Sequence, residues 1–212
     1  MFRRKPKVFG IGRNKTGTTS LTAAMDSLGY RIGSQEKAEL LIEDWARRDF
    51  ASIIRLSKSA DFFQDIPFSL PFTFQALDQA FPGSKFVLTV RGSADEWWQS
   101  MRRFRAKIMG SEGAPTADNY RAYRYRDSLP ADWFWRSQEL IYGLTNENID
   151  NEQLFKAHYL AHNLSAREYF RQRPADLLEL DLSQEDALGR LVRFLEIPDV
   201  GNAAFPHLNR TR

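Results

Sequence analysis

A glycine-containing loop joins the first apolar segment of the chain to the first helical segment, and this order of elements constrains the fold most. Residues 7–12 are a short apolar run, and residues 18–28 repeat apolar residues at helical spacing. Gly12 and Gly17 stand five positions apart between them. A helix that begins directly after such a loop aims its free N–H groups and its positive dipole end at an anion. The sequence therefore predicts a phosphate-binding loop over residues 10–20.

The rest of the chain alternates strand and helix patterns. The clearest strand is residues 85–90, a nearly continuous apolar run as expected for a parallel sheet covered on both faces. The alternation predicts an α/β fold, a doubly wound, mostly parallel sheet flanked by helices, with a P-loop-like nucleotide-binding arrangement. Residues 110–130 predict a mobile loop or lid. Further strands are predicted at residues 61–65 and 176–182, and helices at residues 35–45, 50–56, 72–81, from 93 onward, 131–143, 151–171 and 185–195.

Length and composition fit one domain over residues 1–212, with 42% hydrophobic and 27% charged residues. The net charge of +3 suits a polyanionic small molecule and is far below that of most nucleic-acid binders. The chain has no cysteine, which excludes disulfide and thiolate chemistry. No apolar run approaches the roughly 18 residues of a membrane span, and the basic N-terminus does not lead into a signal-peptide core. We expect a cytoplasmic protein that binds no nucleic acid.

The loop departs from the pattern of ordinary nucleoside-triphosphate loops. In those loops a lysine and a serine or threonine follow the second glycine directly. Here Thr18 and Thr19 stand at those positions, and the lysine comes earlier, at Lys15. A Rossmann loop is excluded too, because no third glycine follows Gly10 and Gly12 at the required place. The sequence therefore predicts a phosphate-containing ligand other than a nucleoside triphosphate.

Residues 15–19, with the sequence Lys-Thr-Gly-Thr-Thr, resemble the 5′-phosphosulfate loop of sulfotransferases. That family uses 3′-phosphoadenosine 5′-phosphosulfate (PAPS). A second family motif pairs an arginine at a strand end with a serine on the next helix, and both hold the 3′-phosphate. Arg91 ends the strand at 85–90, and Ser100 follows nine positions later, one more than in cytosolic members; Gln99 is the alternative. The similarity continues at residues 81–91, 181–182, 194–195 and 205–209 and points to a bacterial branch of the family.

The resemblance implies which residues bind the donor and which act in catalysis. Lys15 would follow the negative charge that builds on the bridging oxygen, and no metal is expected. For the base, Asp65 stands where cytosolic members carry a histidine, and Glu36 is the second candidate. Asp65 has another interpretation, as a cap of the turn before Pro67. The residues expected to bind PAPS are Arg13, Asn14, Lys15, Thr16, Gly17, Thr18, Thr19, Ser20, Arg91 and Ser100.

Two parts of the family pattern are missing from this chain. Ser20 stands where cytosolic members place a tryptophan that stacks on adenine. Trp97 and Trp98 lie on the helix after Arg91, but neighbours in a helix point in two directions, so we expect at least one of them in the core. The C-terminal Arg-Lys-Gly that also grips the 3′-phosphate is absent, and the arginines at 210 and 212 are its possible substitutes.

Two further groups of residues, a pair of histidines and a basic run, are most simply explained without a ligand. His158 and His162 are four positions apart, which is compatible with zinc, but no cysteine or HExxH pattern accompanies them. Ordinary histidines are favoured, with His162 and Asn163 as possible lining of an acceptor pocket. The basic run Arg102, Arg103, Arg105 and Lys107 favours a solvated helix face, or else a guide for the polyanionic donor.

The leading interpretation is a PAPS-dependent sulfotransferase that acts on a hydroxyl or amine of a small-molecule or carbohydrate acceptor. An alternative enzyme is a P-loop nucleoside or sugar kinase, which would require a lysine directly after Gly17. A non-catalytic nucleotide-binding module is the third interpretation, and it would bind the desulfated donor without transferring sulfate. The residues name no particular acceptor.

Overall fold

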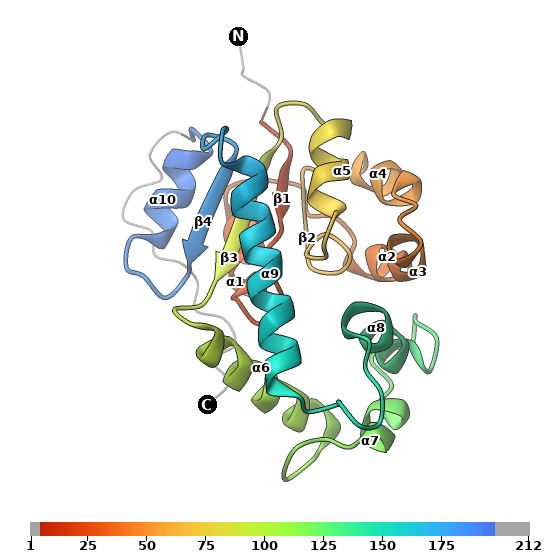
Figure 1. Ribbon diagram of the computed structural model, residues 1–212. Coiled ribbons are helices and arrows are strands. Elements are labelled where there is room, and N and C mark those ends of the chain that lie inside the picture. The colour runs from red at the N-terminus through yellow and green to blue at the C-terminus, as the bar shows by residue number, and fades with distance from the viewer. Residues whose placement is uncertain (1–4, 198–212) are drawn as a thin grey trace.

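The computed structural model describes residues 5–197, which form an all-parallel sheet with helices on both faces (Figure 1). The strands lie in the order β2-β1-β3-β4. Because β1 has β2 on one side and β3 on the other, the winding of the chain reverses at β1, and ligands bind at such a switch point. The predicted α/β fold with a doubly wound parallel sheet is confirmed. The strands are β1 (Val8–Gly10), β2 (Phe62–Gln64), β3 (Lys85–Val90) and β4 (Leu177–Asp181).

The helices of the described part follow the predicted order with two differences. The segment predicted as one helix over residues 35–45 is two short helices, because the chain bends at Leu40 and Leu41 while the apolar spacing continues. The predicted lid at 110–130 contains a helix, which starts with a capping box between Thr116 and Asn119. The helices are α1 (Thr18–Ser27), α2 (Gln35–Glu39), α3 (Ile42–Ala46), α4 (Ala51–Ser57), α5 (Thr73–Ala80), α6 (Ala94–Met109), α7 (Ala117–Ala122), α8 (Trp133–Tyr142), α9 (Glu152–Phe170) and α10 (Ala187–Phe194).

Each strand sends successive side chains to opposite faces of the sheet, so the sheet has a hydrophobic cluster on either side. Val8 and Val87 pack in one cluster with residues of α1 and α10. Phe9 and Phe86 pack in the other, with residues of α5 and α9. Figure 1 shows α9 lying across this second face. The sheet is thereby buried on both faces, which matches the nearly continuous apolar runs of its strands.

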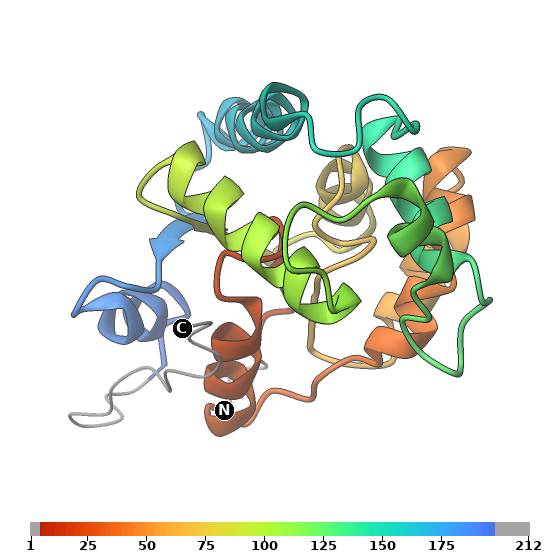
Figure 2. The ribbon, with the colours of Figure 1, turned by 90° about the horizontal axis from the view of Figure 1, so that it is seen from below.

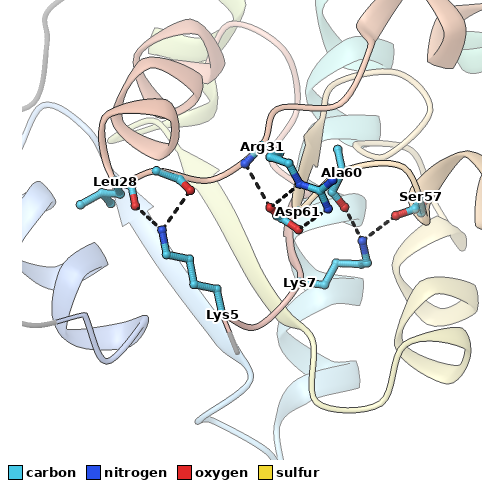
Figure 3. Close-up of polar contacts among 8 residues, drawn as sticks. Lys5, Lys7, Leu28, Arg31, Ser57, Ala60 and Asp61 are labelled. Carbon is cyan, nitrogen blue, oxygen red and sulfur yellow. Dashed lines mark hydrogen bonds and ion pairs between the residues drawn. The ribbon is translucent and has the colours of Figure 1, made fainter. Parts of the chain in front are cut away.

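Polar contacts close the amino-terminal ends of β1 and β2 (Figure 3). Lys5 Nζ donates to two carbonyls at the end of α1, at 2.7 and 2.9 Å, and Lys7 Nζ donates to the carbonyl of the last residue of α4 and to that of Ala60. A cation suits both places, because helix C-termini carry free carbonyls and partial negative charge. Arg31 and Asp61 form an ion pair beside them, with Nε and Oδ2 3.0 Å apart. The opposite, carboxyl-terminal edge of the sheet is left for the site.

Among residues 5–197, no helix has both the length and the apolar character that a membrane-spanning segment needs.

The close approach of the loop to β3 predicts a strict requirement for glycine at position 12. A Cβ on Gly12 would lie 2.1 Å from Thr89 Oγ1 and 2.4 Å from the Thr89 carbonyl oxygen, and the strand cannot move away without losing its pairing. We expect Gly12→Ala to lower the free energy of unfolding by about 1–3 kcal/mol, measured by urea denaturation. Gly113→Ala is the control, because a Cβ there meets nothing within 4 Å. Equal midpoints for the two variants would contradict the close approach.

Candidate active site

A cavity of about 970 Å³ lies where the carboxyl ends of all four strands meet. Residues 14–20 after β1, Asp65 after β2, Arg91 after β3 and Leu182 after β4 all line it. Residues of α6 and α8 also line it, as do Glu39 of α2 and the loop residues Tyr125 and Arg126. Figure 2 views the molecule from the side on which α6 and α8 lie. The volume is that of a small-molecule site, and the position is the switch point of the sheet.

The loop before α1 turns its carbonyl groups toward the scaffold. The Asn14 carbonyl accepts a hydrogen bond from the Trp97 indole N–H at 2.9 Å. The Lys15 carbonyl accepts one from Arg91 Nε, also at 2.9 Å. In contrast, the N–H groups of residues 15–19 donate to no acceptor within residues 5–197. The loop thus offers the cavity free N–H donors at a helix N-terminus, which is how proteins bind phosphate without a metal.

The backbone of this loop is held in a sparsely populated conformation. Lys15 has φ 69° and Gly17 has φ 99°, and a side chain on Gly17 would also meet Leu182, 2.6 Å from its Cβ. Few residues other than glycine adopt such angles, so the surroundings must enforce them at Lys15. One restraint is the pair of hydroxyls of Thr16 and Thr89, whose oxygens lie 2.6 Å apart. Successive N–H groups in such turns form a concave anion-binding site.

Lys15 brings a positive charge into the cavity that no acidic side chain neutralises directly. Its Nζ lies 4.1 Å from the centre of the Phe104 ring, and it forms no ion pair within the described residues. Burial lowers the pKa of Lys15, the nearby Arg91 lowers it further, and Asp65 raises it in part. Arg103 also lines the cavity without an ion pair to any described residue. These cations repel one another, and a bound polyanion would relieve the repulsion.

Arg91 and Ser100, which the sequence predicts as a second anion site, both line the cavity. The backbone N–H of Arg91 donates to the Tyr159 hydroxyl at 3.0 Å, and its Nε holds the loop, so its two Nη groups remain for a ligand. Ser100 is on α6 with 8% of its surface exposed. Gln99 lines the cavity as well, so the structure brings both alternatives to the site.

Arg13 is the residue of the predicted donor set that the structure places away from this cavity. Its guanidinium is buried behind the loop, where it donates to the Ser69 carbonyl at 3.2 Å and to the Tyr142 hydroxyl at 2.7 Å. The other nine predicted donor residues all line the cavity. Arg13 therefore supports the loop from behind, whereas residues 14–20 face the ligand space.

Asp65 lines the cavity next to the start of α1. Its Oδ2 accepts a hydrogen bond from the Thr18 hydroxyl at 3.4 Å, and its backbone has φ 61°. Burial raises the pKa of Asp65, against the opposing effects of Thr18, Arg13 and Lys15. No N–H of the turn before Pro67 donates to this carboxylate within residues 5–197, so the interpretation as a turn cap has no contact to support it. Glu36 is exposed and outside the cavity wall.

Glu39 is a buried carboxylate of the cavity wall that the sequence patterns do not single out. It lies on α2 one turn after Glu36 and is 2% exposed. Arg126 and Tyr125 contact it; from its loop position, the sequence suggests that their segment, residues 120–126, could hold a sugar or a phenol. The sequence signal that could have identified it is its position: Glu39 is a charged residue on the face of the predicted helix at 35–45 that is expected to be buried. Its partners come from a loop 86 positions away, so local spacing could not identify them.

The two tryptophans on α6 are both in the core. Trp97 is 0% exposed and stacks on Tyr159 with ring centres 4.5 Å apart; Trp98 is 1% exposed and stacks on Phe155 at 5.1 Å. Neither lines the cavity, so neither replaces the missing adenine-stacking tryptophan. The arginines at 210 and 212 and the segment 205–209 lie outside the described residues.

One of the two histidines, His162, and one residue of the basic run, Arg105, are buried. His162 is buried away from the cavity, and its Nε2 donates to the Ile11 carbonyl at 2.7 Å; burial lowers its pKa to about 3. Within the described residues no three His, Cys, Asp or Glu side chains gather as a metal site requires. In the basic run, Arg105 contradicts the solvated-face interpretation, because it is 3% exposed and its guanidinium donates to Gln138 Oε1 at 3.0 Å.

Comparison with known proteins agrees with this geometry. A family model described as a sulfotransferase domain matches residues 7–212. The chain belongs to the sulfotransferase family. A search of curated proteins finds none that matches the chain. The family assignment confirms the resemblance drawn from residues 15–19 and makes the chain a transferase whose general reaction is sulfuryl transfer.

The raised pKa of Asp65 in this sulfotransferase predicts how its charge affects stability. The folded protein binds the proton of Asp65 more tightly than the unfolded chain does, so ionisation costs stability as pH rises from about 4 through the folded pKa. Asp65→Asn removes that loss, and asparagine tolerates the positive φ. We expect the variant to melt at or above the wild-type temperature at neutral pH, and the difference in Tm to grow as pH rises from about 4.

The control for this comparison is Glu112→Gln, which removes an exposed carboxylate and should leave the melting curve unchanged at every pH. A neutral-pH melting temperature of Asp65→Asn well below that of the wild type would show that the ionised carboxylate stabilises the fold, which is the opposite of what its burial predicts.

Proposed function

We propose that this sulfotransferase takes its sulfuryl group from PAPS and transfers it to a hydroxyl or amine of a small-molecule or carbohydrate acceptor. The observation that carries the proposal is the loop geometry: residues 15–19 line the cavity, their N–H groups donate to no acceptor within residues 5–197, and Arg91 is hydrogen-bonded to the same loop. The cavity therefore offers two adjacent places for anionic groups. PAPS carries two such groups, a 5′-phosphosulfate and a 3′-phosphate.

The residues present fit this donor. Residues 15–19 would hold the 5′-phosphosulfate through backbone N–H groups, and Arg91 with Ser100 would hold the 3′-phosphate. Arginine suits the second place because its planar guanidinium bonds two phosphate oxygens at once. Arg103 adds a third cation to the wall that forms no ion pair within residues 5–197, and it supports the interpretation of the basic run as a guide for the donor. A phosphate-rich ligand would offset the mutual repulsion of these groups.

The reaction needs charge stabilisation at the leaving group and a base at the acceptor. When bound, PAPS supplies a sulfuryl group on a phosphate leaving group. The S–O bond to that phosphate breaks while the acceptor oxygen or nitrogen forms a bond to sulfur. Lys15 holds its positive charge where negative charge builds on the departing oxygen, and Asp65 takes the acceptor proton.

Asp65 suits the role of base better than Glu36 and Glu39. Burial raises its pKa, which makes the carboxylate a stronger proton acceptor than an exposed one. Glu36 does not line the cavity. Glu39 lines it, but its two oxygens are engaged by Gln35, Tyr125 and Arg126.

The donor assignment predicts selective, metal-independent binding of 3′-phosphoadenosine 5′-phosphate. At a concentration of about 100 Kd this ligand should stabilise the protein by about 2.7 kcal/mol, which raises Tm by roughly 5–10 °C. The shift should be the same with EDTA and with Mg²⁺, and ATP should give little. Differential scanning fluorimetry measures it. A preference for ATP with Mg²⁺ would favour the kinase interpretation instead.

Variants of the same titration identify the residues involved. Lys15→Ala should abolish most of the shift, and Arg91→Ala should remove the preference for the bisphosphate over adenosine 5′-phosphate. Lys58→Ala is the matched control, because Lys58 is exposed at the end of α4, away from the cavity. If Lys15→Ala bound as tightly as Lys58→Ala, the loop would not be the donor site.

The assignment of the base predicts a separation of binding from turnover. Asp65→Asn should bind the bisphosphate as the wild type does, while transfer of ³⁵S from labelled PAPS to a pooled set of hydroxyl and amine acceptors falls at least about 10²-fold. Glu36→Gln should transfer at the wild-type rate. Undiminished transfer by Asp65→Asn would remove Asp65 from the mechanism, and binding of donor without transfer by the wild type would favour the non-catalytic module.

A further inference from the structure

Glu39 joins several parts of the cavity wall that lies away from the loop. Its Oε1 accepts hydrogen bonds from Gln35 Nε2 and from the Tyr125 hydroxyl, each at 3.3 Å. Its Oε2 lies 3.0 Å from Arg126 Nε in an ion pair. Burial raises the pKa of Glu39, and the adjacent Arg126 opposes that effect. The side chain thus contacts three neighbours, at 2% exposure of the residue.

The backbone of the same residue holds a third wall residue. The Glu39 carbonyl accepts a hydrogen bond from the Trp133 indole N–H at 3.0 Å. The Tyr125 ring stacks on Trp133, with ring centres 5.2 Å apart and planes inclined by 19°. Glu39 thus fixes an aromatic surface that is built from two separate segments, α8 and the loop before it. Both aromatic residues line the cavity.

This wall also carries hydrogen-bond donors whose direction is set by their partners. Arg126 uses Nε for Glu39, and its Nη groups form no further ion pair with the described residues. Gln138 accepts from the buried Arg105 through Oε1, so its amide nitrogen is the group left over. One of that nitrogen's two hydrogens goes to the Ser137 hydroxyl at 3.2 Å, and the other is free. Asp65, which can accept a hydrogen bond, lines the same cavity.

We infer that this wall, formed by Tyr125, Arg126, Trp133 and Gln138 and organised by Glu39, is the acceptor subsite and that it takes a ring bearing several hydroxyl groups, as a sugar does. The inference rests on the proposed function, since the donor must occupy the loop for the acceptor to lie here. One acceptor hydroxyl meets Asp65, and others accept from Arg126 and Gln138. The aromatic surface packs on the C–H face of the ring.

A plain phenol fits this wall poorly. Its single hydroxyl would meet Asp65 and leave the amide N–H of the buried Gln138 and the Nη groups of the partly exposed Arg126 without acceptors. A site built to hydrogen-bond substrate hydroxyls discriminates strongly against analogues that lack them, because each unpaired buried group costs free energy. Glu39 itself is a positioning residue, because it acts on the acceptor through Arg126, Tyr125 and Trp133.

The test combines transfer assays with a direct probe of the wall. The acceptors are a pool of glucose, galactose, maltose and lactose, compared with 4-nitrophenol, each supplied with ³⁵S-labelled PAPS. The wall is followed by the ¹⁵N-indole NMR signal of Trp133, assigned from Trp133→Phe. We expect the pool to be sulfated at least about tenfold faster than the phenol and to shift the Trp133 signal.

The variant Glu39→Gln removes the ion pair with Arg126 while keeping the size of the side chain. It should raise KM for the pool about tenfold, with kcat and bisphosphate binding within about twofold of the wild type. Glu43→Gln is the matched control, because Glu43 links α3 to Arg136 of α8 through an exposed ion pair that does not touch the wall. This control should leave KM unchanged.

The outcomes separate the two proposals. If the bisphosphate binds but the phenol is sulfated as well as the pool, or the pool leaves the Trp133 signal unchanged, the acceptor inference is overturned and the donor assignment stands. Wild-type KM for Glu39→Gln would equally overturn the role of Glu39. If the bisphosphate fails to bind, the proposed function fails, and the acceptor inference that rests on it falls as well.

Discussion

The site depends on how the scaffold holds the loop after β1. Donors from two distant segments, the indole of Trp97 and the guanidinium of Arg91, bond the carbonyls of Asn14 and Lys15. With its carbonyls occupied there, the loop presents the N–H groups of residues 15–19 to the cavity. Gly12 packs so closely on β3 that a side chain at this position would clash with Thr89. Arg91 has two roles in this arrangement: its Nε hydrogen-bonds the loop, and its Nη groups can bind a second anion.

The cavity carries groups of both charges. The cations Lys15, Arg91 and Arg103 come from the loop, the end of β3 and α6, and the carboxylates Asp65 and Glu39 come from the segment after β2 and from α2. Burial shifts the pKa of Lys15 downward and that of Asp65 upward, so each group is held away from its ordinary ionisation behaviour. Perturbed groups of opposite sign in one cavity are characteristic of catalytic sites.

Much of this architecture could be predicted from local sequence patterns, and the rest depends on contacts between residues far apart in the chain. The loop at residues 10–20 and the strand at 85–90 could be predicted because glycine spacing and apolar runs are properties of neighbouring residues. The burial of Arg13 and Arg105 could not, since it depends on Tyr142 and Gln138, more than 30 positions away. Glu39 escaped prediction for the same reason. The family resemblance identified the chemistry of the loop, and it left the acceptor side open.

The central claim is that one cavity binds the two phosphate groups of the donor at the loop and at Arg91 without a metal. A crystal structure of the protein with 3′-phosphoadenosine 5′-phosphate, grown in EDTA, tests it most directly. We expect the 5′-phosphate within hydrogen-bond distance of the N–H groups of residues 15–19 and of Lys15 Nζ, and the 3′-phosphate at Arg91 and Ser100. A 5′-phosphate bound away from the loop, or a 3′-phosphate that leaves Arg91 without contact, would contradict the claim.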